Sequence, residues 1–136
     1  MFSSRNAPTA DQRPVVDLMD GLSNAQKRQV LQHMAPIDLR AGEVVASQGE
    51  HAREFYLLVD GSVEVTRDDT AIATIDQGSF FGEIGALTHA RRNATVIASE
   101  DITVEVMNRR QLATVLDLWP ELASQVQTAA MERMAG

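Results

Sequence analysis

The chain has 136 residues, a length typical of one domain with a small extension. Cysteine is absent, which excludes disulfides, zinc-thiolate sites and thiol nucleophiles. The 19 acidic residues outnumber the 12 lysines and arginines, and the formal net charge of −7 argues against general binding to nucleic acid or anionic membranes. No apolar run approaches the length of about 18 residues that a membrane span needs, and the N-terminus lacks the apolar segment of a signal peptide. We therefore expect a cytoplasmic protein without membrane insertion.

The N-terminal part is expected to be a leader followed by one helix. Residues 1–19 are predicted to be mobile, because most of them are small or polar. Ser23 and Gln26 have the spacing of a capping box, which predicts a helix that ends near Met34.

The middle of the chain is expected to be rich in β-structure. Short apolar or alternating runs recur about every eight to twelve residues and are separated by turn residues, a pattern typical of an all-β sandwich or barrel. Asp60 followed by Gly61 is a strong hairpin signal, and Asp68 with Asp69 marks a second turn. The predicted strands cover residues 44–47, 55–59, 62–66, 71–75, 94–98 and 102–107.

Two helices are expected at the C-terminal end. Asn108 suits an N-cap, and apolar residues recur with a helical period from Leu112 to Trp119. Pro120 suits the first turn of a second helix, whose apolar side includes Leu122. The sequence therefore predicts a mainly β body with one helix before it and two after it.

Residues 78–98 carry the most informative chemistry. Gly82 allows the backbone to approach a ligand closely, and a short helix beginning there directs free N–H groups outward, which favours a phosphate. Arg92 can add a charge-assisted pair to that phosphate, and Glu83 can accept a hydrogen bond from a ribose hydroxyl. These groups indicate a sugar-phosphate clamp. They do not indicate a hydrolytic site, because no base, nucleophile or metal set accompanies them.

This segment closely resembles the phosphate-binding cassette of the cyclic-nucleotide-binding domain family. The matching residues are Phe81-Gly82-Glu83-Ile84-Gly85 and Arg92-Asn93-Ala94-Thr95, and the nine-residue step from Glu83 to Arg92 is similar to the kinase-regulatory and channel branches. The resemblance covers about residues 20–134. It implies one domain over residues 20–136, built as a jelly-roll β-roll (a double-stranded β-helix) with flanking helices, the last of which closes as a lid.

The resemblance also implies a ligand and the residues that hold it. The ligand would be cyclic AMP (cAMP) or cyclic GMP (cGMP), and no metal is implied. Glu83 would bind the ribose, Arg92 would pair with the phosphate, Val65 would form part of the wall against the base, and Arg133 would reach the base from the lid helix. The full implied set is Val65, Gly82, Glu83, Ile84, Arg92, Asn93, Ala94 and Arg133.

Several of these residues also have a purely structural interpretation. Glu83 suits the start of a surface helix and Arg133 the end of another, through the helix dipole. Arg91 and Arg92 can form a solvated pair, for which Arg91 is the better candidate. Asn93 stands where the family usually has Ala, Ser or Thr. Because the threonine that the family links with guanine preference is missing there, we favour cAMP over cGMP.

We expect a non-catalytic cyclic-nucleotide sensor that acts on an unidentified effector protein through its last helix. The alternative is a protein-interaction domain that has kept the fold and lost the ligand. A metal enzyme with a similar jelly-roll fold is not favoured, because His33, His51 and His89 are scattered over three segments. A phosphodiesterase would need a metal cluster of His and Asp, and the sequence has none at a suitable spacing.

Overall fold

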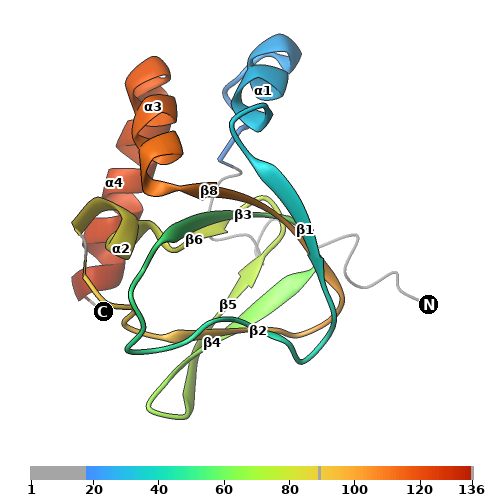
Figure 1. Cartoon of the computed structure of the whole chain (residues 1–136), viewed down its shortest axis with the longest axis vertical. Helices are drawn as coiled ribbons and strands as arrows, with labels where there is room; N and C mark the ends of the chain where they lie inside the picture. Colours follow the sequence, from blue (N-terminus) through green and yellow to red (C-terminus); the bar gives the residue numbers. More distant parts are fainter. Residues whose placement is uncertain (1–17, 89, 136) are drawn as a thin grey trace.

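The computed structural model describes residues 18–88 and 90–135, which form two antiparallel sheets with helices packed around them (Figure 1). The first sheet has the strand order β1-β8-β3-β6, and its strands are β1 (Ala35–Leu39), β8 (Ile102–Asn108), β3 (Glu54–Asp60) and β6 (Phe80–Phe81). The second sheet has the order β2-β7-β4-β5, and its strands are β2 (Val44–Ala46), β7 (Thr95–Ala98), β4 (Ser62–Arg67) and β5 (Thr70–Asp76). The prediction of a mainly β body with flanking helices is confirmed.

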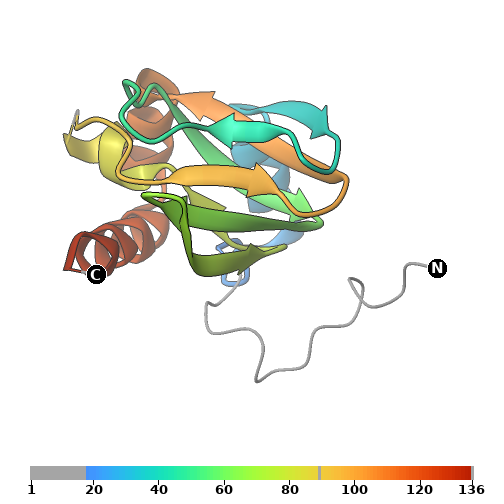
Figure 2. The same ribbon diagram turned by 90° about the horizontal axis from the view of Figure 1, so that it is seen from below.

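The helices in this part of the chain are α1 (Asn24–Leu31), α2 (Glu83–Thr88), α3 (Arg109–Leu118) and α4 (Pro120–Ala135). In Figure 1, α1 and α3 stand on the side of the first sheet that faces away from the second sheet. Figure 2 shows that α2 and the end of α4 gather at one end of the two layers. None of the described helices is long and apolar enough to cross a membrane.

Local sequence signals account for several element boundaries. The capping box before α1 is present, with the Gln26 amide donating to Ser23 Oγ at 3.1 Å and the Ser23 amide donating to Gln26 Oε1 at 2.9 Å. Asn108 caps α3 in the same way. In the turn between β4 and β5, Asp68 and Asp69 both have positive φ, as a type I′ hairpin turn requires.

The first strand was not predicted, and the first helix is shorter than predicted. α1 ends at Leu31, because the chain is already extended at Ala35 and pairs there with β8. Pro36 lies within this strand, opposite Glu105. Proline is tolerated there because β1 is at the edge of its sheet and one side needs no backbone donor.

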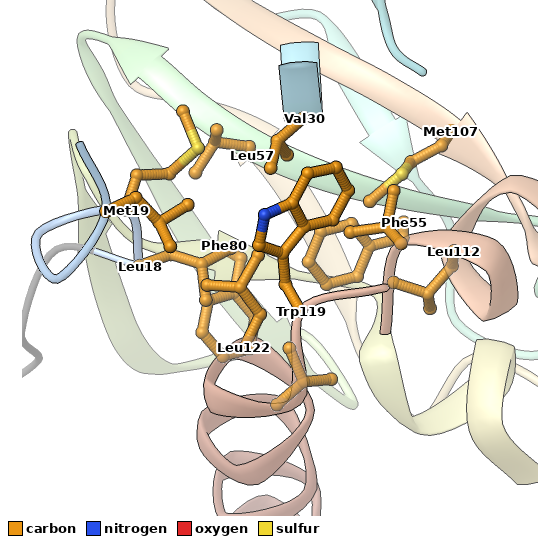
Figure 3. Close-up of a cluster of buried hydrophobic side chains, with 13 residues drawn as sticks. Leu18, Met19, Val30, Phe55, Leu57, Phe80, Met107, Leu112, Trp119 and Leu122 are labelled. Atoms are coloured by element: carbon orange, nitrogen blue, oxygen red, sulfur yellow. The ribbon is translucent and has the colours of Figure 1, made fainter. Parts of the chain in front are cut away.

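Strand β3 is buried on both faces and separates two hydrophobic clusters. Phe55 and Leu57 point to the helices, whereas Tyr56 and Leu58 point to the second sheet, as the period of two along a strand dictates. The helix-side core contains Leu18, Met19, Leu22, Val30, Phe55, Leu57, Phe80, Met107, Leu112, Val115, Trp119, Leu122 and Val126 (Figure 3). The inter-sheet core contains Ala46, Tyr56, Leu58, Val63, Phe81, Val96, Ala98, Ile102 and Val104.

Two residues at the end of the predicted leader belong to the helix-side core. Leu18 and Met19 are buried there, and the Leu18 amide donates to the Gly78 carbonyl at 3.0 Å. Packing against the domain therefore begins no later than Leu18. The rest of the predicted leader, residues 1–17, lies outside the described residues.

We expect Gly85→Ala to lower the free energy of unfolding by about 1–3 kcal/mol, the usual cost of overpacking a core. An ideal Cβ on Gly85 would lie 1.8 Å from the Cβ of Ala52 and 3.1 Å from the Ala90 carbonyl oxygen, so α2 or the segment before β3 must shift. Urea denaturation measures the loss. Gly21→Ala is the matched control, because nothing lies within 4 Å of the added Cβ. Equal stability of Gly85→Ala and the parent chain would contradict this packing.

Candidate functional site

A cavity of about 470 Å³ lies between the second sheet, α2 and the end of α4. All eight residues singled out from the sequence line it: Val65, Gly82, Glu83, Ile84, Arg92, Asn93, Ala94 and Arg133. These residues come from β4, α2 and the turn before it, the segment before β7, and α4. The structure thus brings the whole predicted set together around one space, and the role of each residue in ligand binding stays a prediction.

Gly82 links strand β6 to helix α2 at a point where only glycine fits well. Its φ of +89° is in the left-handed region, and an added Cβ would lie 2.7 Å from the Glu54 carbonyl oxygen and 2.9 Å from Arg92 Nη1. The bare backbone at Gly82 therefore passes directly beside the Arg92 guanidinium.

Arg92 is held in place by its backbone and its side chain. Its amide donates to the Glu50 carbonyl at 2.8 Å, and its own carbonyl accepts from the Gly49 amide at 2.9 Å. Its Nη2 donates to the Glu54 carbonyl at 3.0 Å, and its Cζ lies 5.7 Å from the centre of the Tyr56 ring. This guanidinium is half-buried and anchored on one side, which does not fit the interpretation as a solvated pair with Arg91.

Glu83 is the first residue of α2, and its side chain is only 2% exposed. The interpretation as a surface acid at a helix start is therefore wrong. Its Oε1 accepts from Arg133 Nη1 at 2.6 Å. Burial raises the pKa of Glu83 above its ordinary value, although the Arg133 charge, the Glu83 amide and the Arg92 charge each act to lower it.

Arg133 reaches into the site from the last helix. Besides the pair with Glu83, its Nη1 donates to the Phe80 carbonyl at 2.9 Å, and its Cζ lies 5.2 Å from the centre of the Phe80 ring. The family resemblance implied a contact between Arg133 and a base. In this structure the guanidinium joins Phe80 and Glu83, two residues before and one residue after Gly82, and so ties α4 to the site. Its contact with a base stays a prediction.

The remaining predicted residues form the walls. Val65 lies between Ala73 of β5 and Val96 of β7, its partners across the second sheet. Ala94 is buried and Asn93 is exposed. The Asn93 carbonyl accepts from Arg67 Nε at 3.0 Å.

Sequence reasoning missed several residues that line the same cavity. Arg67 lies two residues after Val65 on β4, so the alternation of side chains along a strand could have placed it on the same face. Ser79 and the end of β5 carry no comparable signal, because Ser79 is placed by a hydrogen bond from the Leu58 amide of β3, a strand distant in the sequence. No group of three or more His, Cys, Asp or Glu residues among positions 18–88 and 90–135 could hold a metal ion.

The geometry and the cassette agree with a comparison against known families, in which the cyclic nucleotide-binding domain matches residues 36–118. The chain belongs to this family. The resemblance stated from residues 78–98 is therefore confirmed.

Individual relatives and structures agree with this assignment. The chain is 31% identical over 119 residues to a cGMP-dependent protein kinase of Plasmodium berghei. The matched region covers 87% of this chain and 14% of the kinase. It is 26% identical over 121 residues to a cyclic nucleotide-gated potassium channel of Rhizobium etli. That match covers 89% of this chain and 34% of the channel. The fold matches the regulatory subunit of a cAMP-independent protein kinase A from Trypanosoma brucei with a TM-score of 0.73 at 22% identity, over 85% of this chain and 43% of that one. The chain thus spans only a minor part of each curated relative.

The buried Glu83 carboxyl predicts a pH-dependent contribution to folding. Because its pKa is raised from 4.5 in the folded chain, the unfolded chain releases this proton first as the pH rises. The stability contributed by the neutral carboxyl is present below about pH 4.5 and is lost as the pH rises through the raised pKa. As the pH rises from about 4.5 through the raised pKa of Glu83, the free energy of unfolding of Glu83→Gln should increase relative to that of the parent. Urea denaturation at a series of pH values measures this difference.

Glu64→Gln is the matched control for this experiment, because Glu64 is exposed on β4. A difference between Glu83→Gln and the parent that does not change with pH would contradict the assignment of a raised pKa to Glu83.

Proposed function

We propose that this chain is a non-catalytic sensor that binds a cyclic nucleotide, with cAMP preferred over cGMP, and signals through its C-terminal helix. The observation that carries the proposal is that Gly82, Glu83 and Arg92 line one cavity together. A carboxylate, a guanidinium and a closely approaching backbone match the ribose and the phosphate of a cyclic nucleotide. The preference for cAMP rests on Asn93, which replaces the residue that the family links with guanine.

Arg92 is suited to pair with the phosphate. A guanidinium has five N–H donors in a rigid fork, and within residues 18–88 and 90–135 the Arg92 side chain makes one hydrogen bond, from Nη2 to the Glu54 carbonyl. The anchored side fixes the orientation of the fork, while the other donors remain for a bidentate, charge-assisted pair. Such preorganisation reduces the entropy that a flexible side chain loses on binding.

Glu83 is suited to bind a ribose hydroxyl while it keeps its pair with Arg133. A carboxylate can accept about four hydrogen bonds, so one oxygen can hold Arg133 while the group also accepts from the ligand. The same carboxylate then joins the ligand and helix α4. A ligand that changes the hydrogen bonds of Glu83 changes the free energy of docking α4, which is the condition for signalling through this helix.

The alternative function is a protein-interaction domain that has kept the fold and lost the ligand. The same fold occurs in the regulatory subunit of a cAMP-independent protein kinase A from Trypanosoma brucei. In this chain Glu83 and Arg92 are both present and both line the cavity, which favours the sensor. In either case we propose that an effector protein reads the position of α4.

Isothermal titration of the purified chain with cAMP and, separately, with cGMP tests the sensor directly. We expect one ligand per chain, tighter binding of cAMP, and a micromolar dissociation constant, which corresponds to about −8 kcal/mol. Absence of heat with both ligands, together with an unchanged melting temperature at about millimolar ligand, would instead support the interaction domain.

Arg92→Ala should weaken cyclic-nucleotide binding at least tenfold. Removal of one partner from a desolvated charge pair costs about 2–4 kcal/mol, because the phosphate is left without its counter-charge. The measurement is the same titration. Arg110→Ala is the matched control, because Arg110 is exposed and lies outside the lining of this cavity. Unchanged affinity in Arg92→Ala would rule out the clamp.

Ligand binding should alter hydrogen exchange in α4, because Arg133 connects that helix to Glu83. We expect slower exchange of the α4 amides when cAMP is added to the parent chain, measured by mass spectrometry on peptides from residues 120–135. Peptides from β1 serve as the internal control for a local effect, because β1 contributes none of the residues of the helix-side core. Identical exchange of α4 with and without bound cAMP would contradict signalling through this helix.

A further inference from the structure

A second groove, open to solvent and about 440 Å³ in volume, lies apart from the cavity that holds the cassette residues. It is found where strand β8 ends and helix α3 begins (Figure 1). Its five lining residues are all polar or basic: His51, Arg53, Asn108, Arg109 and Arg110. None of them lines the cavity. The groove therefore offers a ligand positive charge and hydrogen-bond donors.

Basic side chains are concentrated in this groove. Three of the 12 lysines and arginines of the chain line it, although the formal net charge of the chain is −7. Glu54 pairs with Asn108 at the end of the β3–β8 ladder, so Arg53 and Arg109 each lie one residue beyond that pair. Like charges at facing positions of two strands repel each other, and an anionic ligand relieves this repulsion.

The positive charges of Arg53 and Arg110 are not neutralised inside the domain. Both side chains are exposed, and no carboxylate in the part of the chain that the structure describes lies within 4.0 Å of either guanidinium. Glu50 and Glu54, which flank Arg53 in the sequence, each bond another group instead. The groove therefore keeps its charge for a ligand from outside.

The floor of the groove is held in place by the rest of the domain. Arg109 Nη2 donates to the carbonyl of the buried Ala52 at 2.6 Å. The neighbouring His51 forms an isolated β-bridge with Arg91, and Asn108 is fixed as the N-cap of α3. A ligand thus meets a preformed surface, which reduces the entropy lost on binding.

We propose that this basic groove binds a short segment of a partner protein that is rich in Asp and Glu. The fork of a guanidinium matches a carboxylate with two parallel hydrogen bonds. Successive residues of a helix point about 100° apart, so Arg109 and Arg110 leave α3 in different directions. They suit carboxylates spaced along a chain better than one small anion. A long nucleic acid is disfavoured because the chain as a whole is acidic.

An acidic segment can bind this groove whether or not the cavity binds cAMP, because the two share no lining residue. An effector protein is part of both proposed functions, the sensor and the interaction domain. Titration of the parent chain with cAMP decides between those functions without the groove. Failure of the sensor and failure of the groove are therefore separate results.

Fluorescence anisotropy of a labelled oligoglutamate peptide, titrated with the purified chain, tests the groove. We expect one peptide per chain and weaker binding as the salt concentration rises, because exposed charges are screened. A variant that combines Arg53→Glu with Arg110→Glu should bind the peptide at least about tenfold more weakly, because like charges then face each other. The matched control combines Arg28→Glu with Arg40→Glu. It makes the same change in charge at exposed positions outside the groove and should bind the peptide nearly as the parent does.

Thermal unfolding of both double variants checks that they fold. If the groove variant does not fold, Arg110→Ala takes its place, with an expected loss of about three- to fivefold in affinity. Absence of peptide binding at about millimolar chain, or equal losses in the groove variant and its control, would overturn the proposal. Equal affinity for an oligoglutamine peptide would do the same. Tighter binding of a single-stranded oligonucleotide through the same arginines would instead make the groove a nucleic-acid site.

Discussion

The double burial of the paired strands β3 and β6 is the constraint on which the site depends. Phe80 stacks on Phe55 on the helix side, with ring centres 5.5 Å apart, and Phe81 stacks on Tyr56 between the sheets, with centres 4.8 Å apart. A shift of β6 by one residue would turn both phenylalanines to the opposite face of the sheet. Full burial of one such ring is worth about 1.5–3 kcal/mol, so the observed register is strongly favoured. The chain therefore enters Gly82 from a fixed direction, and the cassette begins at a defined place.

The charges of the site are arranged around this rigid entry. Glu83 is buried at the start of α2, where removal from water works against its ionised form. Arg133 offsets part of that cost, although it lies 50 residues away in the sequence. Arg92 is anchored on the other side of Gly82 by the Glu54 carbonyl and the Tyr56 ring. The two guanidinium groups thus differ in role: one is fixed by the β-roll, and the other arrives with α4.

The helix-side core explains how a change at α4 can reach the rest of the domain. Trp119 lies at the junction of α3 and α4 and packs into the cluster that includes Val30 of α1 and Leu122 of α4 (Figure 3). The Trp119 ring meets His33 edge-on, with centres 6.1 Å apart. Because such a core is close-packed, α4 cannot shift without repacking against its neighbours. The N-terminal and C-terminal helices are therefore mechanically linked, at a distance from the cavity.

The sequence by itself determined the features that depend on near neighbours. The capping box at Ser23, the N-cap at Asn108, the turn at Asp60 and Gly61 and the spacing from Glu83 to Arg92 all follow from local chemistry. The recurring short strands predicted the mainly β fold, and the resemblance of the cassette predicted the residues around the cavity. Only the tertiary structure decided the rest. Strand β1 is largely exposed and contains Pro36, so no alternation marks it, and it exists because β8 supplies its hydrogen bonds. The pairing of Glu83 with Arg133 depends on how distant segments pack. Burial and the loss of water that accompanies it are properties of the folded chain, and no local pattern encodes them.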